Sequence, residues 1–248
     1  MNIGAVSVSI LCLAFSVLLS AGTAPEIKTP LLVWDINFND DPLDKPPRPM
    51  TKEQIESQQK DILATLPIRT YSNIEYLTAT RRAVVLKEAA GLKDQAVLFI
   101  YEENAHPQYG PRMWCNVPPA LVTTGKLWRL SFDVSKGSVA KSGGVVLWGM
   151  MLGIGFYEDG TVRAGNAEIA RYTANKPLHV ECIIDVPGKK ATITVNGKSE
   201  SSITIPWTKP NVPFFTNVTF EGLLPGGHGE APSSIAFDNI KLLMEESK

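Results

Sequence analysis

Residues 178–205 read LHVECIIDVPGKKATITVNGKSESSITI and contain the most regular pattern in the chain. Every second position from 178 to 186 is apolar or cysteine, and the alternation resumes at positions 191, 193 and 195. Successive side chains of a strand point to opposite faces, so both segments are predicted to be strands with one apolar face. Asn196-Gly197 is a strong turn signal, because both residues tolerate positive φ. With a third strand around Ile203 and Ile205, the stretch predicts a β-meander that must cover a second sheet.

The rest of the chain extends this pattern from residue 31 to residue 243. Short strand candidates alternate with turns rich in Gly, Pro and Asp, which is typical of a sandwich or barrel. Thr51 followed by Gln54 is a capping-box signature, so one short surface helix is expected over residues 51–63. No linker divides the chain, and a single domain is expected over residues 23–248. The other expected strands are 31–38, 82–86, 96–101, 127–134, 145–152, 154–157, 162–164, 169–172, 212–224 and 234–243.

Composition and charge narrow the classes of partner. The chain has 248 residues, of which 44% are hydrophobic and 20% charged, as in an ordinary globular protein. Its 24 basic and 25 acidic residues give a formal net charge of −1. Neither this balance nor any local Lys/Arg cluster favours a nucleic-acid partner. A near-neutral surface suits uncharged ligands such as glycans.

The N-terminal residues predict export. Residues 3–21 (IGAVSVSILCLAFSVLLSA) carry no charge and are followed by small residues, which favours a signal peptide over residues 1–22, cleaved after Gly22. An uncleaved anchor is the alternative, although serines dilute the run relative to a transmembrane helix of about 20 strongly apolar residues. No second apolar run is long enough, so no membrane span is expected in the mature chain.

Export would leave two cysteines, Cys115 and Cys182, in the mature chain. In an oxidising compartment a disulfide between them would close a loop of about 67 residues, with a stabilisation of about 4 kcal/mol in the chain-entropy model. The alternative is that Cys182 is a small buried hydrophobe, as its alternation with Val180 and Ile184 implies. No closely spaced Cys and His residues indicate a redox motif or a zinc site.

Three segments resemble secreted concanavalin A-like or laminin-G-like jelly-roll domains of bacterial type. They are GIGFYEDGTVRAG at 153–165, HVECIIDVPGKKATITVNGK at 179–198 and FDNIKL at 237–242. The resemblance implies an antiparallel jelly-roll β-sandwich in which the last strand closes a sheet beside the first. It does not fix an activity, because this fold hosts lectins, carbohydrate-binding modules, glycosidases, lyases and adhesion domains.

Glycan binding needs aromatic rings that stack on sugars, with planar polar groups beside them. The residues nominated for such a ligand-binding face are Trp148, Tyr157, Arg163, Tyr172, His179 and Glu181. The alternative for Trp148 and Tyr157 is that they are core or sheet-edge aromatics.

Catalysis finds no support in a linear motif. Retaining glycosidases need two carboxylates about 5–5.5 Å apart. Glu181 and Asp185 share one face of a strand but would lie about 13 Å apart, which indicates solvated surface charges. The strand motifs of polysaccharide lyases and the Gly-x-Ser-x-Gly nucleophile turn are absent from the sequence.

A structural calcium ion is a further hypothesis, implied by the resemblance at the place where the first and last strands meet. Asp40 and Asp238 are the nominated ligands, with Asp35 and Asp41 as further carboxylates. The alternative is that the acidic cluster caps a turn and that Asp238 accepts backbone hydrogen bonds.

The leading hypothesis is an exported, non-catalytic carbohydrate-binding or surface-interaction domain. Two alternatives stay open at this point. One is a glycan-active enzyme, either a glycosidase or a polysaccharide lyase, whose acids come from separate strands. The other is a structural or adhesive module with a protein partner.

Overall fold

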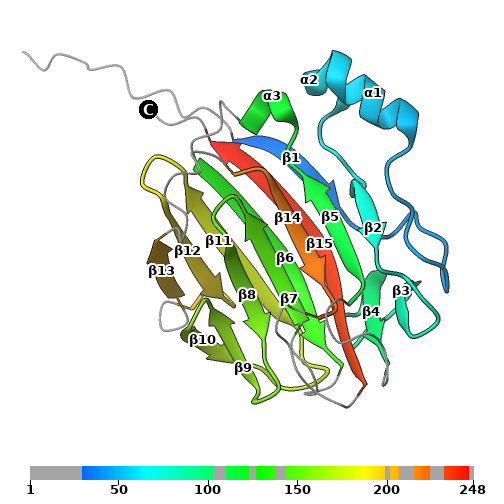
Figure 1. Ribbon diagram of the computed structural model, residues 1–248, viewed down its shortest axis with the longest axis vertical. Coiled ribbons are helices and arrows are strands. Elements are labelled where there is room, and N and C mark those ends of the chain that lie inside the picture. The colour runs from blue at the N-terminus through cyan, green and yellow to red at the C-terminus, as the bar shows by residue number, and fades with distance from the viewer. Residues whose placement is uncertain are drawn as a thin grey trace, which may run out of the picture.

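The computed structural model describes residues 30–102, 110–122, 127–137, 143–198, 202–206, 215–223 and 232–245. These residues form two antiparallel sheets that pack face to face as a jelly-roll β-sandwich (Figure 1). The predicted fold class is therefore confirmed. The predicted signal peptide, residues 1–22, lies outside the described residues.

Sheet A is eight-stranded, in the order β13-β12-β11-β6-β15-β4-β3, with β1 paired to β15 off this path. The opening stretch forms the predicted meander β11-β12-β13 on one edge, and Asn196 and Gly197 take positive φ values of 54° and 64° at the turn. One side of β15 pairs with β6, while its other side pairs first with β4 and then with β1. The last strand thus lies beside the first, as the resemblance implies. The strands are β1 (Leu31–Ile36), β3 (Arg81–Leu86), β4 (Ala96–Tyr101), β6 (Leu127–Lys136), β11 (Leu178–Asp185), β12 (Lys190–Val195), β13 (Ser202–Pro206) and β15 (Ser233–Glu245).

Sheet B is seven-stranded, in the order β10-β9-β8-β7-β14-β5-β2. The predicted segment 145–157 forms two strands, β7 and β8, joined by a turn at residues 149–151. Two strands, β5 and β2, were not predicted, and β5 pairs directly with β14. The strands are β2 (Asn73–Glu75), β5 (Arg112–Asn116), β7 (Gly143–Trp148), β8 (Leu152–Phe156), β9 (Thr161–Ala164), β10 (Ala167–Arg171) and β14 (Asn217–Glu221).

Short helices stand at one end of the sandwich (Figure 1). Helix α1 (Lys52–Lys60) begins with the predicted capping box, in which Thr51 and Gln54 each bond the other's backbone N–H. Helix α2 (Ile62–Thr65) follows, and neither helix has a buried residue. Helix α3 (Pro119–Val122) follows β5 and buries Leu121. Within the described residues, no helix combines the length and hydrophobicity that crossing a bilayer requires.

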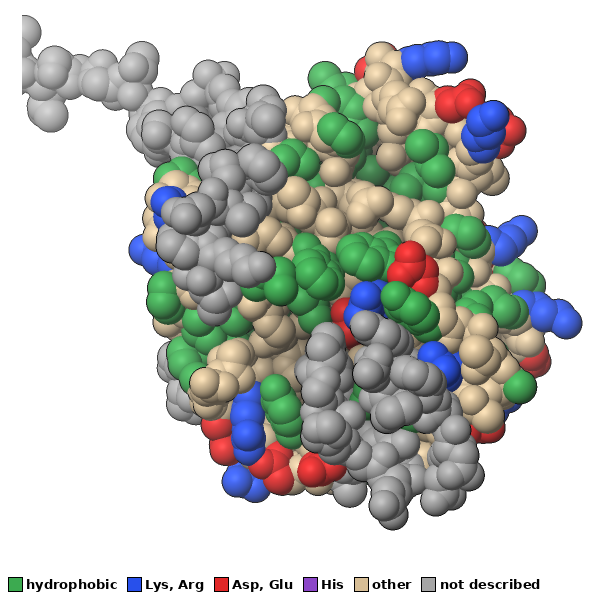
Figure 2. Space-filling model, in the orientation of Figure 1, with side chains coloured by type: hydrophobic (Ala, Val, Ile, Leu, Met, Phe, Trp, Pro, Cys, Tyr) green, Lys and Arg blue, Asp and Glu red, His purple; other side chains and the backbone are tan. Residues whose placement is uncertain are grey.

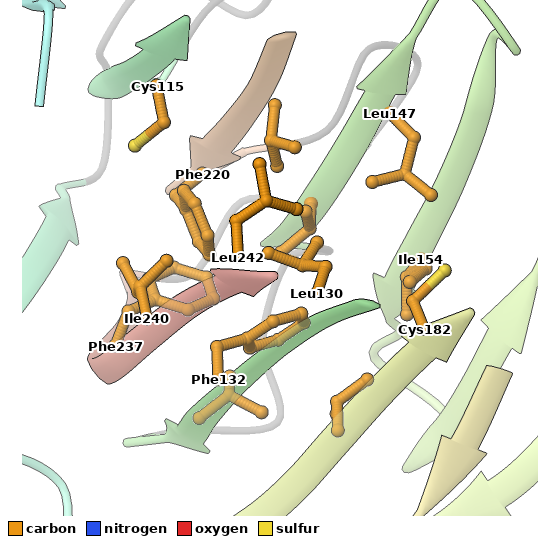
Figure 3. Packing of buried hydrophobic residues seen from close by; sticks show 14 of the residues in the cluster. Cys115, Leu130, Phe132, Leu147, Ile154, Cys182, Phe220, Phe237, Ile240 and Leu242 are labelled. Atoms are coloured by element: carbon orange, nitrogen blue, oxygen red, sulfur yellow. The ribbon is translucent and has the colours of Figure 1, made fainter. Parts of the chain in front are cut away.

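Four phenylalanines from both sheets hold the centre of the core together. Phe237 of β15 lies 5.1 Å from Phe220 of β14, 5.7 Å from Phe99 of β4 and 6.2 Å from Phe132 of β6, measured between ring centroids. Figure 3 shows Phe132, Phe220 and Phe237 turned toward one another between the sheets. All four are fully buried, and truncating one such ring to Ala typically costs about 3–5 kcal/mol.

The predicted disulfide is not formed. Cys115 and Cys182 are both free and buried, the first on β5 of sheet B and the second on β11 of sheet A. Figure 3 shows them on opposite sides of the core cluster, separated by other apolar side chains. Burial raises the pKa of both thiols, that of Cys182 to about 12. The alternative interpretation, a small buried hydrophobe, is the correct one for Cys182 and applies equally to Cys115.

Candidate functional site

Strand alternation divides sheet B into a core face and an outer face. Met113 and Cys115 of β5 are buried in the core, as are Val218 and Phe220 of β14, so the residues between them point outward. The register then aligns Trp114, Thr219 and Val146 in one outward row across β5, β14 and β7. Figure 2 shows hydrophobic side chains gathered in a band across the middle of this face, with basic and acidic side chains beside it.

A stacked tryptophan pair dominates the outer face of sheet B. The rings of Trp114 and Trp148 lie 5.7 Å apart between centroids at an interplanar angle of 21°. Trp148 Nε1 donates to Thr219 Oγ1 at 3.0 Å, which fixes this indole above β14. Both rings are half-buried, so each keeps part of its surface open to solvent. Such rings offer flat apolar area with little loss of conformational entropy on binding.

Beside the pair lies an open floor formed by Gly153 and Gly165. Gly165 N donates to Gly153 O at 3.1 Å, and an added Cβ at either residue would meet no atom within 4 Å. Gly153 is opposite Val146 in the β7–β8 register, so Trp148 is its diagonal neighbour, about 7–8 Å away. The floor therefore gives a planar ligand access to the sheet next to an indole ring.

Arg163 and Tyr157 continue this face on the side of β8 and β9. The Arg163 guanidinium lies 4.9 Å from the centroid of the Tyr157 ring, and its Nε donates to Thr161 Oγ1 at 2.9 Å. A second guanidinium nitrogen donates to Asp159. The side chain is held in place but remains partly exposed, with its planar donors at the edge of the sheet.

A buried ion pair lies beside the tryptophans on the same outward side of β5 and β14. Arg112 Nε lies 3.0 Å from Glu221 Oε1, and Thr219 Oγ1 donates to the same carboxylate at 2.7 Å. Burial raises the pKa of Glu221, while Arg112 acts in the opposite direction. The Arg112 guanidinium also lies 5.6 Å from the Trp114 ring. Because Glu221 is 1% exposed, its carboxylate acts on the position of its neighbours and is not open to a ligand.

Apart from Arg112, which is ion-paired with Glu221, two polar side-chain atoms of the described residues on this face lack hydrogen bonds. They are Trp114 Nε1 and Asn217 Oδ1, and both are buried. Buried donors and acceptors are costly when unpaired, so such atoms favour a water molecule or a ligand group that completes them. One is a donor and the other an acceptor.

The structure separates the residues that the sequence nominated together. Trp148, Tyr157 and Arg163 do share the outer side of sheet B. Tyr172 does not: it is 7% exposed, its hydroxyl donates to the Tyr157 carbonyl at 2.6 Å, and burial raises its pKa to about 12. Its ring packs edge-on against Phe156, so it is part of the core.

His179 and Glu181 lie on the outer face of the other sheet, so their assignment to the same face as Trp148 was wrong. The strand alternation was predicted correctly, but β11 belongs to sheet A. There His179 Nδ1 lies 2.7 Å from Asp133 Oδ1. The other carboxylate oxygen of Asp133, Oδ2, accepts a hydrogen bond from Asn239 Nδ2 at 2.8 Å. Asp185 bonds the backbone of Gly188 and pairs with Lys190 at 3.7 Å. These contacts agree with solvated surface charges.

The nominated calcium ligands are not gathered in one cluster. The described residues contain no group of three or more His, Cys, Asp or Glu side chains arranged to hold a metal ion. Asp40 and Asp41 lie in the loop after β1, where Asp41 Oδ1 accepts from the Arg48 N–H at 3.1 Å. Asp238 is 2% exposed on β15. Burial raises the pKa of Asp238 to about 6, with Asp133 and Asp94 adding to the shift. The calcium ion stays a prediction.

Sequence reasoning missed Arg112, Trp114, Thr219 and Glu221. The segment RMWCN, residues 112–116, lies between Pro111 and Pro118 and was not predicted to be a strand. Its alternation of Met113 and Cys115 with polar or amphipathic neighbours was the available signal. It spans only five residues, which is too short for periodicity alone to decide.

Comparison with known proteins supports the fold and goes no further. No protein-family model and no curated protein sequence matches the chain. Among solved structures, a sialidase matches with a TM-score of 0.53 and 14% identity, over 67% of this chain and 16% of that chain. The binding domain of botulinum neurotoxin DC, solved with rat synaptotagmin II, matches with a TM-score of 0.46 and 11% identity, over 71% and 44%.

The alginate lyase vAL-1 from Chlorella virus matches with a TM-score of 0.44 and 12% identity, over 70% of this chain and 93% of that chain. The chain thus spans less than half the length of the sialidase and neurotoxin chains. At 14% identity, the match to the sialidase supports the fold alone, and a shared fold does not specify an activity.

Proposed function

We propose that this chain is an exported, non-catalytic module that binds a glycan on the outer face of sheet B. The observation that carries the proposal is the stacked pair of Trp114 and Trp148 beside the open floor of Gly153 and Gly165. A sugar ring on this floor presents an apolar face to the Trp148 indole and its hydroxyls to the planar donors of Arg163. The uncharged apolar run at residues 3–21 supports export.

Binding is favoured over catalysis by the state of the Glu221 carboxylate beside the tryptophans. The Glu221 carboxylate is buried and already receives hydrogen bonds from Arg112 Nη2, at 3.2 Å, and from Thr219. A catalytic acid or base needs hydrogen-bond reach to the substrate. The arrangement therefore supports a positioning role for Glu221.

Two substitutions test the face. Trp148→Ala removes one stacking ring, and Gly153→Val fills the floor at a strand position where the added side chain has room. We expect each to weaken glycan binding at least tenfold, about 1.4 kcal/mol, as for a buried aromatic anchor. Affinity electrophoresis against a panel of soluble polysaccharides measures the change, in calcium and in chelator, with products assayed in the same tubes.

His179→Ala on sheet A is the matched control and should leave binding unchanged. Full binding by Gly153→Val would show that the ligand does not use the floor and would overturn the proposed site. Release of oligosaccharide products by the wild-type chain would overturn the non-catalytic assignment. Binding that disappears in chelator would bring the predicted calcium ion into the site.

A further inference from the structure

A pocket of about 550 Å³ lies where helix α1, helix α3 and the ends of β2 and β5 meet. Figure 1 shows α1 and α3 on either side of the ends of these strands. Ile55 of α1 and Val122 of α3 contribute apolar walls, and Asn73 and Asn116 contribute amides from sheet B. The volume is within the range of small-molecule sites.

The side chains that line the pocket favour an uncharged ligand group. The described residues that line it include no charged side chain. Four of them carry amides: Gln58 and Gln59 of α1, and Asn73 and Asn116 of sheet B. Amide groups beside apolar walls suit a ligand group that is itself an amide with an apolar end. They offer nothing to neutralise a carboxylate, sulfate or phosphate.

The pocket adjoins the candidate binding face. Asn116 is in register with Asn217, which is in register with Trp148, so these residues form one outward row across three strands. Thr216, which lines the pocket, accepts a hydrogen bond from Asn217 Nδ2 at 3.3 Å.

We propose that this pocket is a subsite for an uncharged, N-acylated sugar residue; the inference rests on the proposed glycan-binding function and names its ligand class. The acyl methyl group packs against Ile55 and Val122, and the acyl carbonyl accepts from the side-chain amide of Asn116. The N–H of the acylamino group donates to one of the side-chain amide oxygens that line the pocket. An ester-linked acyl group would fill the same space but has no such donor.

Helix α1 allows the pocket to be altered without disturbing the core. None of its residues is buried, and Ile55 is 41% exposed at the rim. Ile55→Trp narrows the pocket from this exposed position. Glu56→Trp places the same ring on the same helix at a residue that does not line the pocket. Asn116→Leu removes an exposed amide with little change in volume.

Saturation-transfer NMR on the full chain tests the inference with small probes that need no knowledge of the natural glycan. The probes are the methyl glycosides of N-acetylglucosamine and N-acetylgalactosamine, and their counterparts with a hydroxyl in place of the acylamino group. We expect the strongest saturation on the acetyl methyl group and at least a fivefold weaker signal from the hydroxyl counterparts. Ile55→Trp and Asn116→Leu should remove the acetyl signal, and Glu56→Trp should keep it.

The outcome is separable from that of the proposed function. Trp148→Ala and Gly153→Val test the face with polysaccharides, whereas Ile55→Trp tests the pocket with monosaccharides. If the acetyl methyl shows no saturation, or if its saturation survives both pocket variants, the subsite is wrong even where the polysaccharide still binds. If the acetyl signal behaves as expected and no polysaccharide binds, the subsite is supported and the proposed glycan-binding face on sheet B is wrong.

Discussion

The outer faces of the two sheets present different kinds of side chain to solvent. On sheet A, polar side chains face solvent and satisfy one another: Arg129 pairs with Glu245 at 3.2 Å, and Thr192 and Thr204 share a hydrogen bond of 2.7 Å. On sheet B, the corresponding positions carry stacked indoles, a glycine floor and an ion pair at 10% and 1% side-chain exposure. The outer face of sheet A thus resembles an ordinary solvent-exposed surface, whereas the outer face of sheet B resembles one side of a binding interface.

Because this fold does not specify a function, the contrast between the faces indicates which of them is the better candidate for a binding site. Polar side chains that complete one another need no ligand, and solvent-exposed pairs of this kind are worth at most about 1 kcal/mol. Apolar rings beside unpaired buried atoms such as Trp114 Nε1 lower stability unless something covers them. The part of the structure that departs from an ordinary surface is therefore the better candidate site.

The largest expected difference between the faces comes from removing one arginine from each. Arg112→Met leaves the Glu221 carboxylate buried without its main counter-charge and should lower the free energy of unfolding by about 3–5 kcal/mol at pH 7. Arg129→Met breaks the partly exposed pair with Glu245 and should cost at most about 1 kcal/mol. Urea unfolding of both variants, followed by tryptophan fluorescence, measures the two values.

The pH dependence separates lost charge from lost packing. Without Arg112, the raised pKa of Glu221 rises further, so the native state binds a proton that the unfolded state releases. The deficit of Arg112→Met should therefore shrink as the pH falls from 7 to 5. The double variant Arg112→Met/Glu221→Leu should recover most of the loss. A deficit that is constant with pH would assign the effect to packing against Trp114.

Asp238 is the exception on sheet A. It shares the outward side of β15 with Ala236, which packs beneath Ala89 and Leu92, so this part of the face is covered. Its Oδ1 atom has no hydrogen-bond partner, and its pKa of about 6 lies above the ordinary value of 3.8. An acid with a raised native pKa destabilises the fold as the pH rises from about 4 through 6, because only the native state retains the proton.

Asp238→Asn should consequently raise the free energy of unfolding at pH 7 by about 1–3 kcal/mol and have little effect near pH 4. Denaturant unfolding at pH 4, 5, 6 and 7 checks the slope as well as the sign. Destabilisation by Asn at neutral pH would mean that the charged carboxylate has a bound partner. Repeating the measurement with calcium present identifies that partner if it is the predicted ion.

Strand alternation predicted the fold because most strands bury one face only. The meander at residues 178–205 and the closing strand β15 were found this way. The capping box at Thr51 was found from the spacing of Thr51 and Gln54, which is also a local signal. Local alternation states which side chains share a face of one strand. It says nothing about which sheet the strand joins, and for this reason His179 was grouped with Trp148 although they lie on different sheets.

Only part of the candidate site could be predicted, because the site is assembled from strands that are distant in sequence. Its main contacts, between Trp114, Trp148 and Thr219, come from three strands that are distant in sequence. The strand order β7-β14-β5 that brings them together is set by long-range pairing. Trp148 could be nominated from its own segment. Trp114 could not be nominated, because only its contact with Trp148 in the folded structure marks it as part of a site.

The smallest expected effect is that of His179→Ala. The ring is 44% exposed and contacts Asp133 at 2.7 Å and Glu181 at 3.8 Å, so its loss removes only solvent-screened interactions. The free energy of unfolding should change by less than about 1 kcal/mol, and the affinity for any glycan retained by the wild-type chain should stay within twofold. Thermal unfolding and the same affinity electrophoresis measure both. Loss of binding equal to that of Trp148→Ala would move the site to sheet A, where His179 lies between Asp133 and Glu181, and the comparison between the faces would reverse.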